Sequence, residues 1–304
     1  MPSEVLSAAP AAFTQASFDY ICKMVYDHSG IALGTDKHYL VQLRIAPLAK
    51  AAGHANIDAF VGALQRGPVN GHRTSIVEAM TTNETSFFRD LSPFEALRQQ
   101  LLPELIKNRG NQPLRIWCGA CSTGQEPYSI AMIIHQHFRQ LVGRVQIVAT
   151  DLANTVLTIA KAGRYSQFEV NRGLPAPMLL KYFDQVGNEW HINDEIKRMV
   201  AFQSMNLVNA WPAMDSFDIV FLRNVMIYFT VETKREILRK IRGVLRKDGH
   251  LFLGTSETTM GLDNAFQRTT LGKAICYTTG GVPAAMTSTL RPSLSAPILA
   301  RSSL

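Results

Sequence analysis

The spacing of hydrophobic residues predicts helices at the start of the chain. Segments such as SFDYICKMVYDHSG, HYLVQLRIAPLAKAAG and IDAFVGAL repeat apolar side chains every three or four positions, which is the period of one helix face. Gly30, Gly53 and the pair Gly67-Pro68 end these segments. Residues 1–80 are therefore expected to form a small all-helical domain.

Residues 81–112 are expected to hold a linker followed by a helix. Ser92 can cap this helix, Pro93 fits its first turn, and Glu95 can complete a capping box. The helix is expected to continue through EALRQQLLPELIKNR, with a kink or break at Pro103.

From residue 113 onward, short apolar segments alternate with amphipathic ones. The apolar segments LRIWCGA, RVQIVATDL, FDIVFLRNVMIYF and HLFLGTSE are typical of strands, and the intervening PYSIAMIIHQHF, TVLTIAKAG and VETKREILRKIRGVLRKDG are typical of helices. This alternation predicts a mainly parallel sheet covered by helices on both faces. The segment AFQRTTLGKAICYTT is expected to add two shorter strands. Residues 113–280 are thus expected to form one α/β domain.

Two segments depart from this alternation. Residues 164–205 contain a short helix and then alternating residues around a Val186-Gly187-Asn188 turn, which predicts a small antiparallel β-subdomain inserted in the α/β domain. Residues 281–304 are rich in Pro, Ser and Ala, and this composition predicts a disordered tail.

The composition suits a globular protein without a membrane span. Hydrophobic residues make up 46% of the chain and charged residues 18%, and no apolar run approaches the ~18 residues of a membrane span. The first residues carry Glu4 and no basic start, unlike a secretory signal. Four cysteines in 304 residues are too few for a disulfide framework, so a reducing, cytoplasmic location is expected. The net charge of +7 favours an acidic partner without choosing its class, and no long Lys/Arg block supports nucleic acid.

The stretch WCGACSTGQEPY follows a predicted strand and precedes a predicted helix, which is the layout of a cofactor-binding loop. Gly119 and Gly124 have the spacing of a phosphate loop, but Gln125-Glu126 stands where such a loop has Lys-Ser/Thr. The dinucleotide fingerprint G-x-G-x-x-G is also absent. A carboxylate suits the cationic groups and ribose diol of S-adenosylmethionine, and Asp151 ends the next strand, where it could hold a ribose or serve as an ordinary helix N-cap. Together these features favour a methyltransferase site.

The cysteine and histidine pairs do not predict a metal site. Cys118 and Cys121 form a C-x-x-C pair without a second pair or a histidine at zinc spacing. His135 and His137 lack a third ligand and are expected to be surface residues.

Several segments along the chain, some of them long and unusual, carry a resemblance. They are TNETSFFRD (82–90), CSTGQEPYSIA (121–131), ATD (149–151), NL (206–207), FDIVFLRNVMIYF (217–229) and GHLFLGTSE (249–257). In these segments, which occur in the family's order and cover most of residues 20–280, the sequence resembles the chemotaxis receptor methyltransferases of the CheR family. The resemblance implies a small helical N-terminal domain and a Rossmann-like class I methyltransferase domain with an inserted antiparallel β-subdomain.

The resemblance also implies a reaction and the residues that carry it out. The reaction is methyl transfer from S-adenosylmethionine to glutamate side chains on the cytoplasmic helical bundle of chemoreceptors, which gives glutamyl methyl esters and S-adenosylhomocysteine for sensory adaptation. Arg89 and Tyr228 would stand at the reaction centre. The residues implied to line the cofactor are Asn83, Thr85, Arg89, Ala120, Glu126, Asp151, Asn206, Leu207, Arg223 and Asn224.

Substrate docking is the least determined part of this interpretation. Lys37, Arg44 and Lys50 recur on or next to one predicted helix, where they could be a solvated helix face or a docking surface for an acidic receptor bundle. Some family members bind a pentapeptide at the receptor's C-terminus through a glycine-containing loop of the β-subdomain. Here the turn at 184–189 is compact, so we expect that no pentapeptide tether is required.

Two other functions compete with receptor methylation. The basic composition is compatible with a nucleic-acid methyltransferase, but the motif [DNS]-P-P-[FYW] is replaced by Arg223-Asn224-Val225-Met226, and no Pro-Cys pair is present. A non-catalytic adaptor that binds the cofactor and docks on receptors is the second alternative, and it predicts cofactor binding without turnover.

Overall fold

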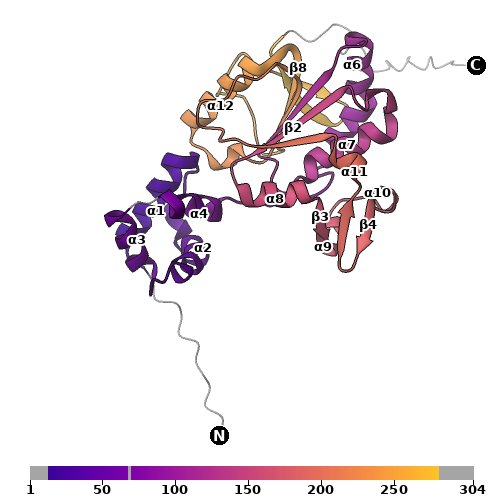
Figure 1. The fold of residues 1–304 in the computed structure, drawn as a ribbon. Helices are drawn as coiled ribbons and strands as arrows, with labels where there is room; N and C mark the ends of the chain where they lie inside the picture. Colours follow the sequence, from indigo (N-terminus) through magenta and orange to yellow (C-terminus); the bar gives the residue numbers. More distant parts are fainter. Residues whose placement is uncertain (1–12, 68–69, 281–304) are drawn as a thin grey trace, which may run out of the picture.

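The computed structural model describes residues 13–67 and 70–280. Helices α1 to α4 form an N-terminal helical domain (Figure 1). Their apolar faces pack together in its core. Phe18, Val41 and Phe60 are buried in this core. The Thr14 side chain caps α1 by accepting a hydrogen bond from a backbone N–H. The tail expected at 281–304 lies outside the described residues. The elements are α1 (Gln15–Ser29), η1 (Thr35–Lys37), α2 (His38–Ala51), α3 (Ile57–Arg66) and α4 (Asn70–Met80).

The helix expected after the linker forms and is interrupted next to Pro103 as expected, but the expected cap at Ser92 was predicted wrongly. Ser92 is the first helical residue and not the cap, because Leu91 precedes the helix and offers no capping side chain. The irregular turn lies before Pro103, where residues 97–101 widen into a π-helix. The elements are α5 (Ser92–Ala96), η2 (Leu97–Leu101) and α6 (Leu102–Arg109).

The α/β domain is built on a seven-stranded sheet with the order β6-β2-β1-β7-β8-β10-β9. The pairs from β6 to β8 are parallel, and β10 runs antiparallel to β8 and β9. The chain moves outward from β1 to β2 and β6, and then returns to β7 on the other side of β1. A cleft is expected at such a reversal, at the carboxyl ends of the strands. The strands are β1 (Leu114–Gly119), β2 (Val145–Asp151), β6 (Val200–Ser204), β7 (Phe217–Leu222), β8 (Leu245–Leu253), β9 (Gln267–Leu271) and β10 (Ala274–Thr278).

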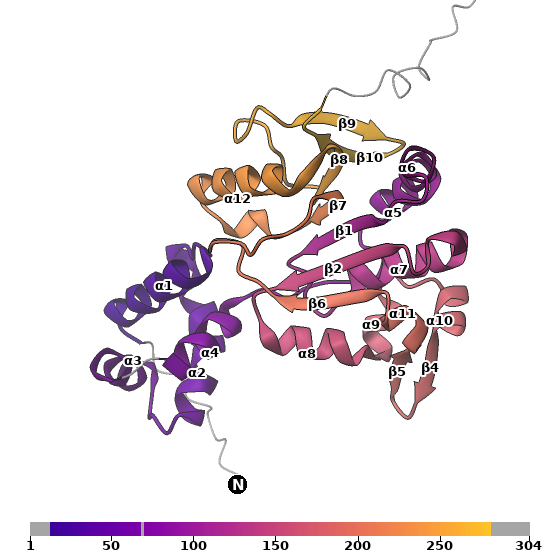
Figure 2. The ribbon, with the colours of Figure 1, turned by 45° about the horizontal axis from the view of Figure 1, so that its top comes forward.

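Helices cover both faces of this sheet (Figure 2). Ile130 of α7 joins the core cluster on one side, and Ile237 of α12 joins the cluster on the other. The helix expected to run to Gly249 ends at Val244, and β8 begins at the next residue. The remaining elements here are α7 (Gln125–His137), η3 (Arg139–Leu141), α8 (Asn154–Ala162), η4 (Met226–Tyr228) and α12 (Val231–Val244).

The inserted β-subdomain is a three-stranded antiparallel sheet with the order β3-β5-β4. It is shorter than the predicted 164–205, because residues 200–204 form β6 and pair in parallel with β2 of the large sheet. Its elements are β3 (Arg164–Ser166), α9 (Gln167–Asn171), α10 (Ala176–Tyr182), β4 (Phe183–Val186), β5 (Glu189–Ile192) and α11 (Asp194–Lys197).

Hydrogen bonds join the helical domain to the α/β domain. The backbone N–H of Ala32 donates to the carbonyl of Tyr228 at 2.9 Å. Glu78 of α4 accepts a hydrogen bond from the backbone N–H of Asn154 at 2.8 Å, so its carboxylate lies at the positive end of α8, which has no capping side chain of its own. Within the described ranges, no helix is long and apolar enough to cross a membrane.

Candidate active site

A cleft opens at the carboxyl ends of β1, β2, β6 and β7. Its walls come from the loops after these strands, from the linker at 81–89, and from Ser29 and Ile31 of the helical domain. All residues that the sequence implies for the cofactor and the reaction centre line this one cleft. They are Asn83, Thr85, Arg89, Ala120, Glu126, Asp151, Asn206, Leu207, Arg223, Asn224 and Tyr228.

The loop between β1 and α7 is held against its neighbours by close contacts. An added Cβ at Gly119 would lie 2.8 Å from Leu222, and one at Gly124 would lie 3.0 Å from Ala160. Gly124 also has a φ of +93°, which side chains rarely adopt. The two glycines therefore serve close packing and a left-handed turn.

Left-handed backbone conformations gather around the cleft. Within 13–67 and 70–280, the non-glycine residues with positive φ all lie in the segments 88–91, 120–122 and 224. Such conformations cost free energy and are typical of functional sites that the surrounding structure holds in place. The residues are Phe88, Asp90, Leu91, Ala120, Ser122 and Asn224.

Asp151 orders the loops at the end of β2. One carboxylate oxygen accepts the backbone N–H of Ser122 at 2.8 Å, and the other accepts that of Ala153 at 3.0 Å. Burial raises the pKa of Asp151, and these hydrogen bonds oppose the rise. It is not the N-cap of α8, which is Ala153. A carboxylate has about four acceptor positions, so this one can also accept ribose hydroxyls.

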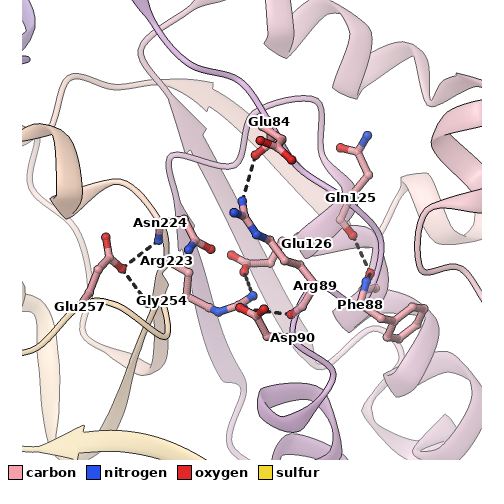
Figure 3. A network of polar contacts seen from close by, with 11 residues as sticks. Glu84, Phe88, Arg89, Asp90, Gln125, Glu126, Arg223, Asn224, Gly254 and Glu257 are labelled. Carbon is pink, nitrogen blue, oxygen red and sulfur yellow. Dashed lines mark hydrogen bonds and ion pairs between the residues drawn. The ribbon is translucent and has the colours of Figure 1, made fainter. Parts of the chain in front are cut away.

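Arg223 is the centre of a buried polar network (Figure 3). Its guanidinium donates to Glu126 at 2.8 Å, to Asp90 at 2.6 Å and to the carbonyl of Arg89 at 2.9 Å. The guanidinium also lies over the ring of Phe94. The network therefore attaches the linker, which contains Arg89, to the loop after β7.

Glu126 lies where the cofactor's cationic groups are expected. Burial raises the pKa of its carboxyl group, and the adjacent Arg223 opposes this rise. The ion pair uses Oε2, which leaves Oε1 as an acceptor on the cleft wall. These features fit an ammonium or hydroxyl group and do not fit a phosphate.

Arg89 and Tyr228 present polar groups that the protein itself uses little. Arg89 donates one hydrogen bond to the carbonyl of Glu84, 3.0 Å away, and a guanidinium has five N–H donors. The half-buried Tyr228 is held through its backbone, since its carbonyl accepts from Ala32. Both side chains line the cleft and are available to a substrate.

Asn206 and Leu207 have structural partners. The Asn206 side chain donates to the carbonyl of His28 and accepts from the backbone N–H of Val208. Leu207 is buried in the core cluster that contains Trp117. These residues therefore join the helical domain to the loop after β6 as well as line the cleft.

The basic residues expected to dock a substrate behave differently from one another. Lys37 pairs with Asp36 at 2.7 Å, and Lys50 is exposed in the last turn of α2. Arg44 donates to the carbonyl of Thr81 at 2.8 Å and more weakly to that of Ala79. Arg44 thus holds the end of α4 and the start of the linker.

The cysteines and one histidine have structural surroundings. Cys118 and Cys121 are buried free thiols, and burial raises the pKa of each well above its ordinary value. His135, expected on the surface, is 3% exposed and lies 2.6 Å from Glu195, because α11 and α10 of the β-subdomain cover it. The described residues contain no group of three or more metal-ligating side chains.

One further carboxylate near the cleft has no role in the sequence interpretation. Glu257 belongs to the segment GHLFLGTSE, which carried the resemblance, yet its partners are backbone N–H groups of two loops. Backbone partners leave no pattern in a sequence, so its role appears only in the structure.

Two models of one protein family match the chain, one on each side of residue 82. Residues 16–81 match the family model "CheR methyltransferase, all-alpha domain", and residues 83–275 match "CheR methyltransferase, SAM binding domain". The parallel sheet and its helices are accordingly a class I, Rossmann-like methyltransferase domain that binds S-adenosylmethionine.

Several known sequences are similar over nearly their whole length. Chemotaxis protein methyltransferase 1 of Pseudomonas aeruginosa is 44% identical over 269 residues, which span 86% of this chain and 97% of that protein. Chemotaxis protein methyltransferase Cher2 of Pseudomonas putida is 43% identical over 253 residues, which span 82% of this chain and 92% of that protein. The chain therefore belongs to the CheR family of S-adenosylmethionine-dependent chemotaxis protein methyltransferases.

Proposed function

We propose that the protein transfers methyl groups from S-adenosylmethionine to glutamate side chains on the cytoplasmic helical bundle of chemoreceptors. The products would be glutamyl methyl esters and S-adenosylhomocysteine, and the enzyme would act in the cytoplasm in sensory adaptation. The observation that carries this proposal is that Arg89 and Tyr228 line the same cleft as Glu126 and Asp151. A carboxylate-binding group thus lies beside carboxylates suited to the cofactor.

The residues of the cleft suit the two ends of this reaction. When bound, S-adenosylmethionine supplies an electrophilic methyl group, whose bond to sulfur breaks as the bond to the glutamate oxygen forms. A substrate glutamate is already ionised near pH 7, so the site needs no strong base. Arg89 would hold one carboxylate oxygen and leave the other free to attack, and Tyr228 would orient the reacting groups. Positioning and exclusion of water are therefore the main contributions of this chain.

A methyl-transfer assay tests the proposal directly. The protein would be incubated with receptor-containing membranes and cofactor tritiated in the methyl group, and the product would then be treated with base. Release of volatile tritiated methanol identifies a carboxyl methyl ester. Label that enters nucleic acid would point to the nucleic-acid alternative, and cofactor binding without transfer to any receptor would support the adaptor.

Cofactor affinity is expected to weaken as the pH falls. Because burial raises the folded-state pKa of Glu126 above 4.5, its carboxylate is protonated before an exposed glutamate would be. Protonation removes the negative charge that faces the cofactor, so we expect the Kd of S-adenosylhomocysteine to rise as the pH falls from 7 towards the range in which Glu126 is protonated. Titration calorimetry measures this change.

The variant Glu126→Gln separates this effect from that of Asp151, whose pKa burial also raises. Glu126→Gln is expected to bind more weakly at pH 7 and to depend less on pH. Asp151→Asn provides the matched comparison. An unchanged pH dependence in Glu126→Gln would assign the effect to Asp151 or to another group.

We also propose that Lys37, beside α2, and the exposed Lys50, on α2, dock the acidic receptor bundle. The double variant Lys37→Glu/Lys50→Glu is expected to raise the KM for receptor about fivefold at low salt, with kcat and cofactor affinity unchanged, because only diffusional capture and docking are altered. Initial rates at several salt concentrations check this, since the difference should shrink at high salt.

Lys161→Glu is the control for each single variant, Lys37→Glu and Lys50→Glu, because Lys161 is exposed on α8 and undergoes the same charge change away from α2. If Lys161→Glu raised the KM for receptor as much as the variants at α2 do, the effect would come from net charge and the docking proposal would be wrong. Arg44 is unsuited to the test because it also holds the linker.

The compact turn between β4 and β5 supports activity without a pentapeptide tether. The two strands pair from Phe183 with Ile192 to Val186 with Glu189, which leaves two residues in the turn. We expect receptor peptides with and without a C-terminal pentapeptide to bind with similar affinity in titration calorimetry. Tight binding that depends on the pentapeptide alone would contradict this expectation.

A further inference from the structure

Glu257 connects two loops at the carboxyl ends of β7 and β8. One carboxylate oxygen accepts the backbone N–H of Gly254 at 2.6 Å and that of Asn224 at 2.8 Å. The other accepts the backbone N–H of Ile227 at 3.3 Å. Figure 3 shows Glu257 beside Asn224 and Gly254. A single side chain thus satisfies donors from both loops.

The backbone held in this way needs external support. Asn224 has a φ of +59°, a left-handed conformation that is costly for a residue with a side chain. Ile227 lies in η4, whose N-cap residue Val225 provides no capping hydrogen bond. Glu257 therefore caps η4, because it accepts a hydrogen bond from a backbone N–H of that helix.

The contact between the two loops leaves no room for adjustment. A Cβ added to Gly254 would lie 2.9 Å from the backbone nitrogen of Asn224 and 2.8 Å from a carboxylate oxygen of Glu257. Because real Cβ atoms do not approach neighbours so closely, the loops fit together only with glycine at 254. The position of the η4 backbone is consequently set by β8 as well as by β7.

We propose that Glu257 is a positioning residue that holds Tyr228, the last residue of η4, in its place on the cleft wall. This inference rests on the proposed function, in which Tyr228 orients the reacting groups. Glu257 itself is not among the residues that line the cleft, so it acts through the loop. Its removal should affect the alignment of Tyr228 more than it affects cofactor binding.

Kinetics of Glu257→Ala and Glu257→Gln test the proposal. Alanine removes all three acceptor contacts, and we expect kcat to fall about 30-fold with the Kd of S-adenosylhomocysteine changed less than about threefold. Glutamine keeps one acceptor oxygen and should recover most of kcat. Glu236→Ala is the control, because Glu236 is an exposed carboxylate that pairs with Arg239 on α12.

A double-mutant cycle with Tyr228→Phe separates positioning from general damage. If Glu257 acts through Tyr228, then Glu257→Ala should lower kcat less than about threefold in the Tyr228→Phe background. A 30-fold loss in both backgrounds would overturn the proposal, as would an equal loss of kcat and of cofactor affinity.

Backbone amide exchange of residues 223–229 gives a readout that does not depend on catalysis. Glu257→Ala should speed exchange in this segment and leave it unchanged in α7, and unchanged exchange at 223–229 would overturn the proposal. A wild-type protein that methylates no receptor would instead overturn the proposed function, while amide exchange would still decide whether Glu257 holds the loop.

Discussion

Arg89→Ala is expected to lower the kcat of receptor methylation about 100-fold while the Kd of S-adenosylhomocysteine changes little. The reason is geometric, because the guanidinium would hold one oxygen of the substrate carboxylate while the other attacks. Loss of such orientation or of one electrostatic donor typically costs a factor of 10² to 10³. Steady-state rates with receptor membranes and titration calorimetry with S-adenosylhomocysteine measure the two quantities separately.

Two variants sharpen this prediction. Arg89→Lys keeps the charge and loses the planar pair of donors, so it should recover only part of the rate. Arg172→Ala is the matched control, because Arg172 is an exposed arginine that pairs with Glu84 in the same linker. A 100-fold fall in cofactor affinity for Arg89→Ala would show that the residue binds cofactor and does not orient substrate.

Asp218→Ala is expected to lower the free energy of unfolding of the α/β domain by about 3–5 kcal/mol. Asp218 is fully buried in β7 and accepts from Arg109 at 2.7 Å and from the backbone N–H of Arg115 at 2.9 Å, with Arg246 3.3 Å away. Removal of the carboxylate leaves the backbone N–H of Arg115 without an acceptor and takes one charge partner from Arg109 and Arg246, while Arg109 keeps Asp248. Since a domain is stable by only about 5–15 kcal/mol, the variant should lose a large fraction of its free energy of unfolding.

A nearby aspartate provides the control for this experiment. Asp215 pairs with Arg115, but its side chain is 80% exposed, so Asp215→Ala should cost less than about 1 kcal/mol. Asp218→Asn keeps the shape and an acceptor oxygen and should fall between the two. Urea unfolding followed by circular dichroism compares the three variants. Equal midpoints for Asp215→Ala and Asp218→Ala would contradict the importance of burial.

Hydrophobic periodicity is sufficient to predict the fold class, but it does not predict the ends of every helix and strand. The alternation of apolar strands and amphipathic helices predicted the α/β domain because burial on both faces leaves a strong pattern. The segment 200–204 alternates like a hairpin strand, and only its pairing with β2 places it in the large sheet. The end of α12 was missed because Asp248-Gly249 looks like a helix terminus, although these residues lie inside β8.

The candidate site shows a similar division. Resemblance of short segments was enough to name residues that line one cleft, since those segments occupy adjacent strand ends. The partners of Arg44, Asn206 and Glu257 could not be predicted, because they are backbone groups up to 178 positions away in the sequence. Backbone groups are the same at every residue, so such contacts leave no mark on composition or spacing.

A ligand bound in the cleft should also stabilise the joint between the helical domain and the α/β domain. Ser29 and Ile31 line the cleft together with Asn206, which is itself bonded to His28. A ligand that needs both walls favours the joined arrangement by RT ln(1 + [L]/Kd), about 2.7 kcal/mol at a concentration 100 times Kd. Binding of a ligand in this cleft and the joint between the two domains are therefore thermodynamically linked, so that each stabilises the other.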